Sequence, residues 1–246
     1  MKTILSNPPY SVPWSAENDF LKDVRFAEYG KLAPKSKADF AFIQDMIYHL
    51  SADGIMSVVL PHGVLFRGSG EGIIRRYIVE SKNVLDAIIG LPANLFFGTS
   101  ISTCILIFKK NRTKNDKVLF IDASDEFQKK GNVNVLTDEH LSKIHNTYIN
   151  RLELPKYSCL VGLDEIADND YNLNIPRYID KFQEDEPIDL ELIMISLDNL
   201  YDERKKLDVE IDKYFIELGL KSAPVTKNKK VKNQNFQQKT LFDYDH

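Results

Sequence analysis

The sequence predicts an α/β fold with a mostly parallel sheet, followed by a helical carboxy-terminal region. In the first half of the chain, short β-branched and apolar runs alternate with segments whose apolar residues recur at helical spacing, which is typical of strands joined by helical crossovers. Towards the carboxyl end, apolar residues of segment 193–218 recur at alternating steps of four and three. The 246 residues, of which 43% are hydrophobic, are enough to bury a sizeable core.

Each element of the first half has its own signal. The strands are apolar runs bounded by Gly, Pro, Asn or Asp, and the helices show one apolar face, for example Phe40, Ile43 and Ile47. We predict strands at 3–6, 55–60 and 84–91, a short one at 118–122, and helices at about 37–50 and 73–81. The long β-branched run 100–109 predicts an antiparallel strand at or near a sheet edge.

The second half is less apolar. Thr137 is a good amino-terminal cap for a helix over residues 138–150, and an irregular stretch follows through Asn169. The apolar residues of segment 193–218 form a heptad seam, a row along one face of a helix. The seam predicts either a terminal helix docked on its own domain or a helix that binds a partner protein. After Leu220 the composition turns to Lys, Asn, Gln and Ser, so we expect a disordered basic tail. The predicted parts are therefore 1–125, 126–186, 187–220 and 221–246.

Composition excludes several classes of protein. No run approaches the apolar length of a membrane span and the amino terminus has no secretory pattern, so we expect no membrane association. Cys104 and Cys159 show no disulfide or zinc spacing, and a reducing cytoplasm fits best. The net charge of −4 does not indicate nucleic acid by itself, but residues 221–246 carry six lysines against two aspartates.

The residues Asn7-Pro8-Pro9-Tyr10 form a stiff corner directly after the first predicted strand. Prolines have no N–H to donate, so the Asn7 side-chain oxygen and the Pro8 carbonyl offer acceptors beside the flat ring of Tyr10. The exocyclic amine of a base presents two N–H donors on a planar ring. The two acceptors of the corner can bind both donors while the Tyr10 ring stacks on the base. The corner predicts a socket for a flipped-out adenine, and a rigid loop without chemistry is the alternative.

This corner resembles the Asp/Asn/Ser-Pro-Pro-Tyr/Phe motif of DNA amino-methyltransferases. Further stretches, in the order expected for the family, resemble the modification subunit of type I restriction-modification systems, which are N6-adenine DNA methyltransferases. They are Lys37-Ala-Asp-Phe-Ala-Phe42, Val58-Val-Leu-Pro-His-Gly-Val-Leu-Phe-Arg67, Ile89-Gly-Leu-Pro-Ala-Asn-Leu-Phe96 and Tyr171-Asn-Leu-Asn-Ile-Pro-Arg-Tyr178.

The resemblance implies a site and a reaction. The catalytic residues are Asn7, Pro8, Pro9 and Tyr10, and methyl passes from S-adenosylmethionine to adenine N6 in DNA. The family places a second aromatic on the other side of the base. Phe96 and Phe97 are both in range, Phe97 is our choice, and a core role is the alternative.

The resemblance also implies that only a carboxy-terminal portion of the subunit is present. In the family, three strands and a glycine-rich S-adenosylmethionine loop precede the corner, whereas six residues precede Asn7 here. We expect a partial Rossmann-like sheet without its first strands, an exposed edge open to self-association, and doubtful cofactor binding. The function is then that of a methyltransferase fragment, inactive alone.

The alternative function is a non-catalytic assembly or regulatory module. In type I systems carboxy-terminal helices of the modification subunit grip the specificity subunit, so the seam favours a partner helix. Expected partners are DNA and the specificity and restriction subunits. The stretch Gln238-Lys-Thr-Leu-Phe242 is similar to a sliding-clamp-binding peptide, although a merely solvated tail is favoured.

The glycines of segment 68–72 suggest a phosphate loop only superficially. Their spacing does not match the dinucleotide fingerprint, and a flexible strand-to-helix connection is favoured. Arg67, Arg75 and Arg76 flank it as candidates for DNA phosphates, with solvated surface charge as the alternative. No Ser/His/Asp or metal-binding set is visible, and no partner for His62 can be named from sequence.

Overall fold

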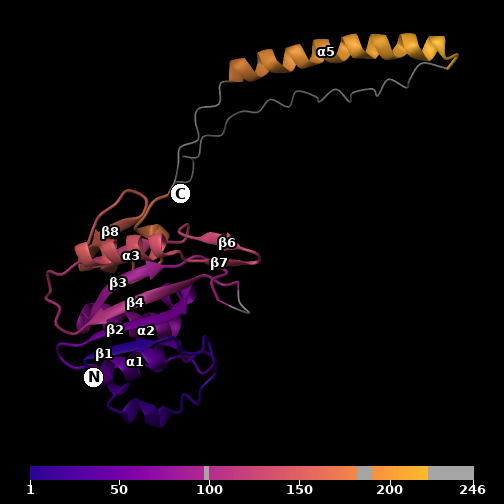
Figure 1. The fold of residues 1–246 in the computed structure, drawn as a ribbon. Coiled ribbons are helices and arrows are strands. Elements are labelled where there is room, and N and C mark those ends of the chain that lie inside the picture. Colours follow the sequence, from indigo (N-terminus) through magenta and orange to yellow (C-terminus); the bar gives the residue numbers. More distant parts are fainter. Residues whose placement is uncertain (97–99, 182–189, 221–246) are drawn as a thin grey trace, which may run out of the picture. The chain divides into compact units, whose positions relative to one another are not determined.

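The structure is a computed structural model that describes residues 1–96, 100–181 and 190–220. The chain divides into two compact units, Met1–Gln183 and Glu184–His246. The first unit contains a six-stranded sheet with the order β1-β2-β4-β3-β5-β8. Its strands are β1 (Thr3–Ser6), β2 (Ile55–Pro61), β3 (Leu85–Gly90), β4 (Thr103–Lys109), β5 (Val118–Asp122) and β8 (Ser158–Val161) (Figure 1).

Four strands of the sheet run in one direction. β1 pairs in parallel with β2, and β3 pairs in parallel with β5. β4 is antiparallel to both β2 and β3, which it separates, and β8 is antiparallel to β5. The mostly parallel sheet confirms the predicted fold class.

The position of β4 corrects one prediction. Its antiparallel direction is confirmed, but the predicted location at or near an edge is wrong, because β4 pairs on both sides. Five of its seven residues are buried. A continuous apolar run that does not alternate with polar residues is typical of a strand covered on both faces, so the run itself favoured an interior strand.

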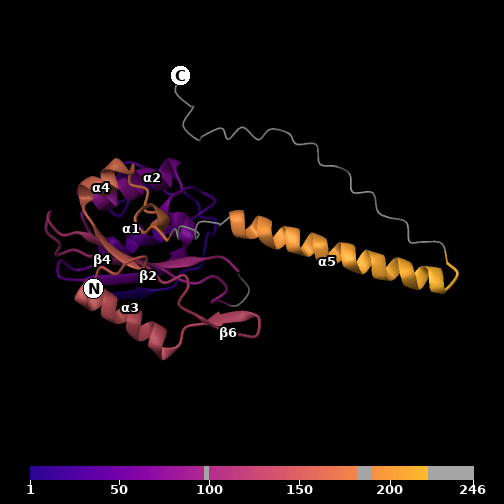
Figure 2. The ribbon, with the colours of Figure 1, turned by 90° about the horizontal axis from the view of Figure 1, so that it is seen from above.

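Helices cover both faces of the sheet (Figure 2). On one side α1 (Asp39–His49), α2 (Ser69–Arg76) and α4 (Leu163–Asp168) contribute Phe40, Ile43, Ile74 and Ile166 to a core that includes Met56 and Phe120 of the sheet. On the other side α3 (Asp138–Asn150) packs Ile144 against a second core that contains Ile89 and Ile121. The first unit is thus a three-layer α/β/α arrangement.

Local signals explain the helix boundaries. Thr137 accepts a hydrogen bond from the His140 N–H while His140 bonds back to the Thr137 N–H, a capping box that starts α3 at the predicted residue. α2 begins at Ser69, four residues before the predicted start, and continues as the π-helical turn η4 (Tyr77–Ser81).

Segment 68–72 is therefore the start of a helix and not a flexible connection. A side-chain carbon at Gly70 would lie 2.9 Å from the Leu32 carbonyl oxygen, so the missing side chain of Gly70 lets α2 pack on that backbone.

Shorter elements complete the first unit. The 3-10 turns are η1 (Asn18–Lys22), η2 (Ala27–Tyr29), η3 (His62–Leu65) and η5 (Ile175–Arg177). A separate hairpin is formed by β6 (Gln128–Lys130) and β7 (Val133–Val135). The hairpin, β8 and α4 were not predicted from the sequence.

The described part of the second unit is one long helix, α5 (Leu190–Glu217). It confirms the predicted helix, and its seam residues, among them Leu200 and Leu207, are exposed. No helix within residues 1–96, 100–181 and 190–220 is both long and apolar enough to cross a bilayer. The tail 221–246, with the clamp-like stretch 238–242, lies outside the described residues. The proposed division of the chain at residues 125 and 186 stays a prediction.

Candidate functional site

The Asn-Pro-Pro-Tyr corner lies at the carboxyl end of β1. This is the end at which open α/β sheets bind ligands. Asn7 is exposed, Pro8 is buried and Tyr10 is half-buried. Within the described residues β1 pairs only with β2, so the corner sits on the outermost strand, where Leu5 is 80% exposed.

Asn7 and Tyr10 are bonded to each other. The Tyr10 hydroxyl donates to Asn7 Oδ1 over 2.8 Å. Burial raises the pKa of Tyr10, and the hydrogen bond to Asn7 only partly offsets this, so the hydroxyl is a donor at neutral pH. Asn7 Oδ1 is an sp² oxygen with two lone pairs, and Tyr10 uses one of them. An amine that approaches Asn7 Oδ1 can bond to the second lone pair, or it can replace Tyr10 at the first.

The chain immediately after the corner is held by Asp39 at the start of α1. Ser11 donates to the Asp39 carboxylate from its backbone N–H at 2.8 Å and from its hydroxyl at 3.2 Å. Ser11 has a φ of 50°, a left-handed conformation that is strained for a residue with a side chain. Two hydrogen bonds to one buried carboxylate offset that strain. Asp39 therefore fixes the direction in which the chain leaves Tyr10.

Arg67 in turn holds Asp39. Its guanidinium donates to Asp39 Oδ2 at 2.5 Å and, through Nε and a terminal nitrogen, to both oxygens of Glu71 at 2.6 and 2.9 Å. Asp39 and Glu71 are 0% and 2% exposed. Burial alone would lower the pKa of Arg67, but the bonds and charges of Glu71 and Asp39 outweigh it and raise the pKa. Arg67 is thus a permanent cation that ties η3, α1 and α2 together below the corner.

One further aromatic ring reaches Tyr10. The ring centroids of Tyr10 and Phe96 lie 6.2 Å apart and the planes meet at 84°, an edge-on contact. Phe97, the preferred second aromatic from the sequence, lies outside the described residues. Its role stays a prediction.

Two buried polar groups near the carboxyl ends of the strands have no hydrogen-bond partner among the described residues. They are His62 Nε2, just after β2, and Thr103 Oγ1, at the start of β4. Burial lowers the pKa of His62, with an opposing effect from Asp122, so the ring is neutral. His62 has no charge to offer a phosphate.

The arginines of segment 67–76 serve the fold. Arg75 is 5% exposed and donates to the carbonyls of Tyr171, Val64 and Arg67. Arg76 is exposed but bonded to Glu80. Because Arg75 is buried and the half-buried Arg67 is already paired with Asp39 and Glu71, the suggestion that these side chains meet DNA phosphates is not supported for those two residues.

The described residues offer no cradle for S-adenosylmethionine. A cradle needs a glycine turn followed by an acidic residue at strand ends. Here β1 leads into the corner, β2 into His62, β3 into Leu91-Pro92 and β5 into Ala123-Ser124. Within residues 1–96, 100–181 and 190–220 no cluster of His, Cys, Asp and Glu is arranged to hold a metal ion.

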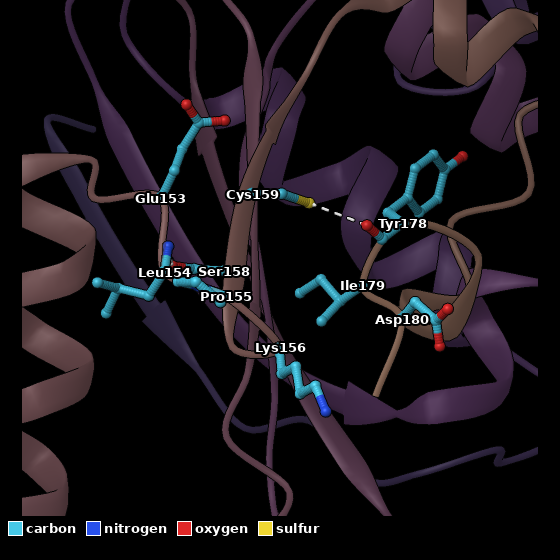
Figure 3. Close-up of a pocket in the computed structure, with 9 residues that line it drawn as sticks. All are labelled: Glu153, Leu154, Pro155, Lys156, Ser158, Cys159, Tyr178, Ile179 and Asp180. Atoms are coloured by element: carbon cyan, nitrogen blue, oxygen red, sulfur yellow. Dashed lines mark hydrogen bonds between the residues drawn. The ribbon is translucent and has the colours of Figure 1, made fainter. Parts of the chain in front are cut away.

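A cavity of about 330 Å³ lies far from the corner, beside β8 at the opposite edge of the sheet (Figure 3). The Cys159 thiol points to the Tyr178 carbonyl oxygen, 3.5 Å away. Burial raises the pKa of Cys159 to about 11, so the thiol is protonated and unreactive at neutral pH. This cavity offers no group for the chemistry of the corner.

Comparison with known proteins identifies the family of the chain. Residues 1–187 match the family model described as N-6 DNA methylase. The chain belongs to the N-6 DNA methylase family. It is 38% identical over 212 residues to the type I restriction enzyme MpnII methylase subunit of Mycoplasma pneumoniae, a match that covers 85% of this chain and 39% of that protein. The MjaVII methylase subunit of Methanocaldococcus jannaschii is 40% identical over 199 residues, or 76% of this chain and 34% of that protein.

A solved structure agrees with this membership. The methyltransferase subunit of a type I restriction-modification system from Streptococcus thermophilus aligns with a TM-score of 0.71 and 55% identity, over 74% of this chain and 38% of that one. This chain therefore spans less than half the length of each of these three relatives. That it corresponds to their carboxy-terminal portion stays a prediction.

Sequence reasoning missed the supports below the corner. Asp39, Arg67 and Glu71 form one network, whereas the sequence suggests only DNA phosphates or solvated surface charge for Arg67 and does not single out the two acids. A spacing of four residues between Arg67 and Glu71 in a helical segment was the one available signal. Asp39 is 28 positions from both Ser11 and Arg67, a separation at which the sequence gives no sign of contact.

Proposed function

We propose that this chain supplies the substrate corner of a type I restriction-modification adenine methyltransferase, and that it is inactive alone. The observation that carries the proposal is the Asn7 and Tyr10 pair at the carboxyl end of β1, fixed from behind by Ser11 and Asp39. The substrate is adenine in DNA, and the methyl donor of the complete enzyme is S-adenosylmethionine.

The corner acts by accepting hydrogen bonds from the adenine amine. The lone pair of that nitrogen is delocalised into the ring, which makes it a poor nucleophile. Asn7 Oδ1 and the Pro8 carbonyl accept its two N–H groups, and these bonds strengthen as positive charge develops on the nitrogen. The Tyr10 ring stacks on the base, a contact worth about 1–3 kcal/mol. Phe97 is proposed to cover the other face of the base.

The chain is proposed to be inactive on its own because the described residues contain no cradle for S-adenosylmethionine. The described residues hold the adenine side of the site but no loop for the methyl donor. We expect purified chain to transfer little or no labelled methyl from S-adenosylmethionine to DNA, with an intact type I methylase as the positive control. Robust labelling of adenine by the purified chain would contradict this part of the proposal.

A second function is proposed for α5. The seam residues Leu200 and Leu207 are 63% and 58% exposed on a regular helix, a state that favours a partner helix over solvent. We propose that α5 docks on a specificity subunit. Docking and catalysis are compatible, and a chain that only docks is an assembly or regulatory module. Contact with the restriction subunit and self-association through the β1 edge are lesser proposals.

A further inference from the structure

A second polar site lies at the other end of the sheet from the corner. Asp86, the second residue of β3, and Lys109, the last residue of β4, lie side by side because these strands are antiparallel. This is the amino end of the parallel strands, whereas Asn7 follows the carboxyl end of β1. The site has no part in the proposed methyl transfer and does not rest on it.

Three cations converge on the Asp86 carboxylate. Lys109 Nζ lies 2.9 Å from Oδ2, while Arg112 and Arg151 lie 2.9 and 3.2 Å from Oδ1. The Tyr148 hydroxyl also donates to Oδ2 at 2.9 Å. Asp86 is 4% exposed, so a single cation would already balance its charge. The cluster carries two positive charges more than the carboxylate neutralises.

Arg112 is the buried centre of this cluster. Its side chain is 2% exposed. The terminal nitrogens donate to Asp86 and to the carbonyls of Asp116 and Lys117. The Nε atom is buried and has no acceptor among the described residues. A buried guanidinium with an unused donor is unfavourable unless an acceptor arrives.

The cluster opens into a cavity of about 510 Å³. Its charged lining residues are Lys109, Arg112, Lys117 and Arg151 against Asp86 and Asp116, which leaves the excess of two positive charges, and the amides of Asn111 and Asn115 line it as well. The volume exceeds that of a phosphate group and is within the usual range of ligand pockets. Lys109 and Arg151 are about one-third exposed, so a ligand entering from solvent meets both.

We propose that this cavity binds a phosphate-class oxyanion, either inorganic phosphate or the phosphate of a nucleotide. Guanidinium groups present forked N–H donors that match phosphate oxygens, and lysine adds a point charge. The amides of Asn111 and Asn115 supply further donors. A purely structural cluster around Asp86 needs neither the charge excess nor an accessible cavity.

The experiment is calorimetric titration of the whole chain with inorganic phosphate at constant ionic strength. The test variant is Arg151→Gln, which leaves two cations on Asp86. The matched control is Lys114→Gln, because Lys114 is an exposed lysine of the loop that carries Arg112 and does not line the cavity. We expect Arg151→Gln to weaken phosphate binding by about tenfold and Lys114→Gln to leave it unchanged. Circular dichroism checks each variant for a folding defect. If Arg151→Gln does not fold, Lys109→Gln tests the cavity through a second cation.

Thermal unfolding gives an independent readout. Phosphate stabilises most proteins by exclusion from their surface, so only the difference between variants is informative. Phosphate should raise the melting temperature of the chain and of Lys114→Gln more than that of Arg151→Gln. Equal increases in all three, or no heat of binding to the unaltered chain, would overturn the proposal.

Further titrations separate the sources of the ligand. Adenosine monophosphate that binds at least as tightly as inorganic phosphate identifies a nucleotide site, and weaker binding identifies a site for the free ion. A poly-glutamate peptide that binds when phosphate does not overturns the proposal in favour of a protein contact.

Discussion

The backbone N–H of Ser11 donates to the Asp39 carboxylate over 2.8 Å and so connects the Asn-Pro-Pro-Tyr corner to the first turn of α1. Because Ser11 has a left-handed backbone and follows Tyr10 directly, this bond fixes the direction in which the chain leaves the corner. Arg67 completes the support from the other side of the carboxylate.

The first prediction concerns this support. Asp39→Asn removes the charge opposite Arg67 and should lower the free energy of unfolding by about 2 kcal/mol. Trp14 is the one tryptophan of the chain and lies three residues after Ser11. Its backbone N–H donates to the Lys35 carbonyl, so its fluorescence reports unfolding of this region. Asp45→Asn on the same helix, where the ion pair with Arg25 is partly exposed, is the control and should cost less than about 1 kcal/mol.

Hydrogen exchange provides the second readout for Asp39. The Ser11 amide should exchange faster in Asp39→Asn than in Asp45→Asn, because only the former weakens its acceptor. Equal stability of the two variants, with unchanged protection of Ser11, would show that Asp39 does not hold the corner.

Acid sensitivity should arise in part at Asp86. Burial alone would raise the pKa of Asp86, but Lys109, Tyr148 and Arg151 outweigh it and hold the folded-state pKa below that of the unfolded chain. A folded-state pKa below the unfolded one stabilises the protein above the unfolded value, and this stabilisation is lost as pH falls through the folded value. Asp86→Asn should therefore cost about 3 kcal/mol at neutral pH and progressively less below about pH 4.

Urea unfolding at several pH values measures this effect. Asp53→Asn is the control, because Asp53 and its ion-pair partner Lys2 are both exposed and lie outside the cluster. A destabilisation by Asp86→Asn that stays constant down to the acid limit would show that the charge of Asp86 is not what stabilises the cluster.

The α5 seam makes a prediction about assembly. Leu200→Asp with Leu207→Asp should abolish co-purification with a specificity subunit, since two charges then enter an apolar interface. Val209→Asp with Ile216→Asp is matched in spacing and chemistry but lies on the opposite face of the helix, and it should co-purify normally. Loss of binding in both pairs, or in neither, would contradict docking through the seam.

The sequence predicted most elements of the sheet but not the contacts that complete the site. The corner and the strand before it were found because two prolines and an apolar run are local signals. The edge position of β4 was wrong because strand order depends on which strands pair. The bond from Tyr10 to Asn7 and the network of Asp39, Arg67 and Glu71 arise only from tertiary packing. β8 has four residues, as β1 has, but no motif such as Asn-Pro-Pro-Tyr marks its end.

The central claim is that Asn7 accepts the adenine amine. Its most direct test is a hybrid in which this chain replaces the matched segment of the Streptococcus thermophilus subunit, assayed for labelled methyl on adenine N6. Asn7→Ala should lower the rate at least about 100-fold while the hybrid still assembles, and Tyr10→Phe, which keeps the ring, should stay within about tenfold. An assembled Asn7→Ala hybrid that methylates adenine at the unaltered rate would contradict the claim.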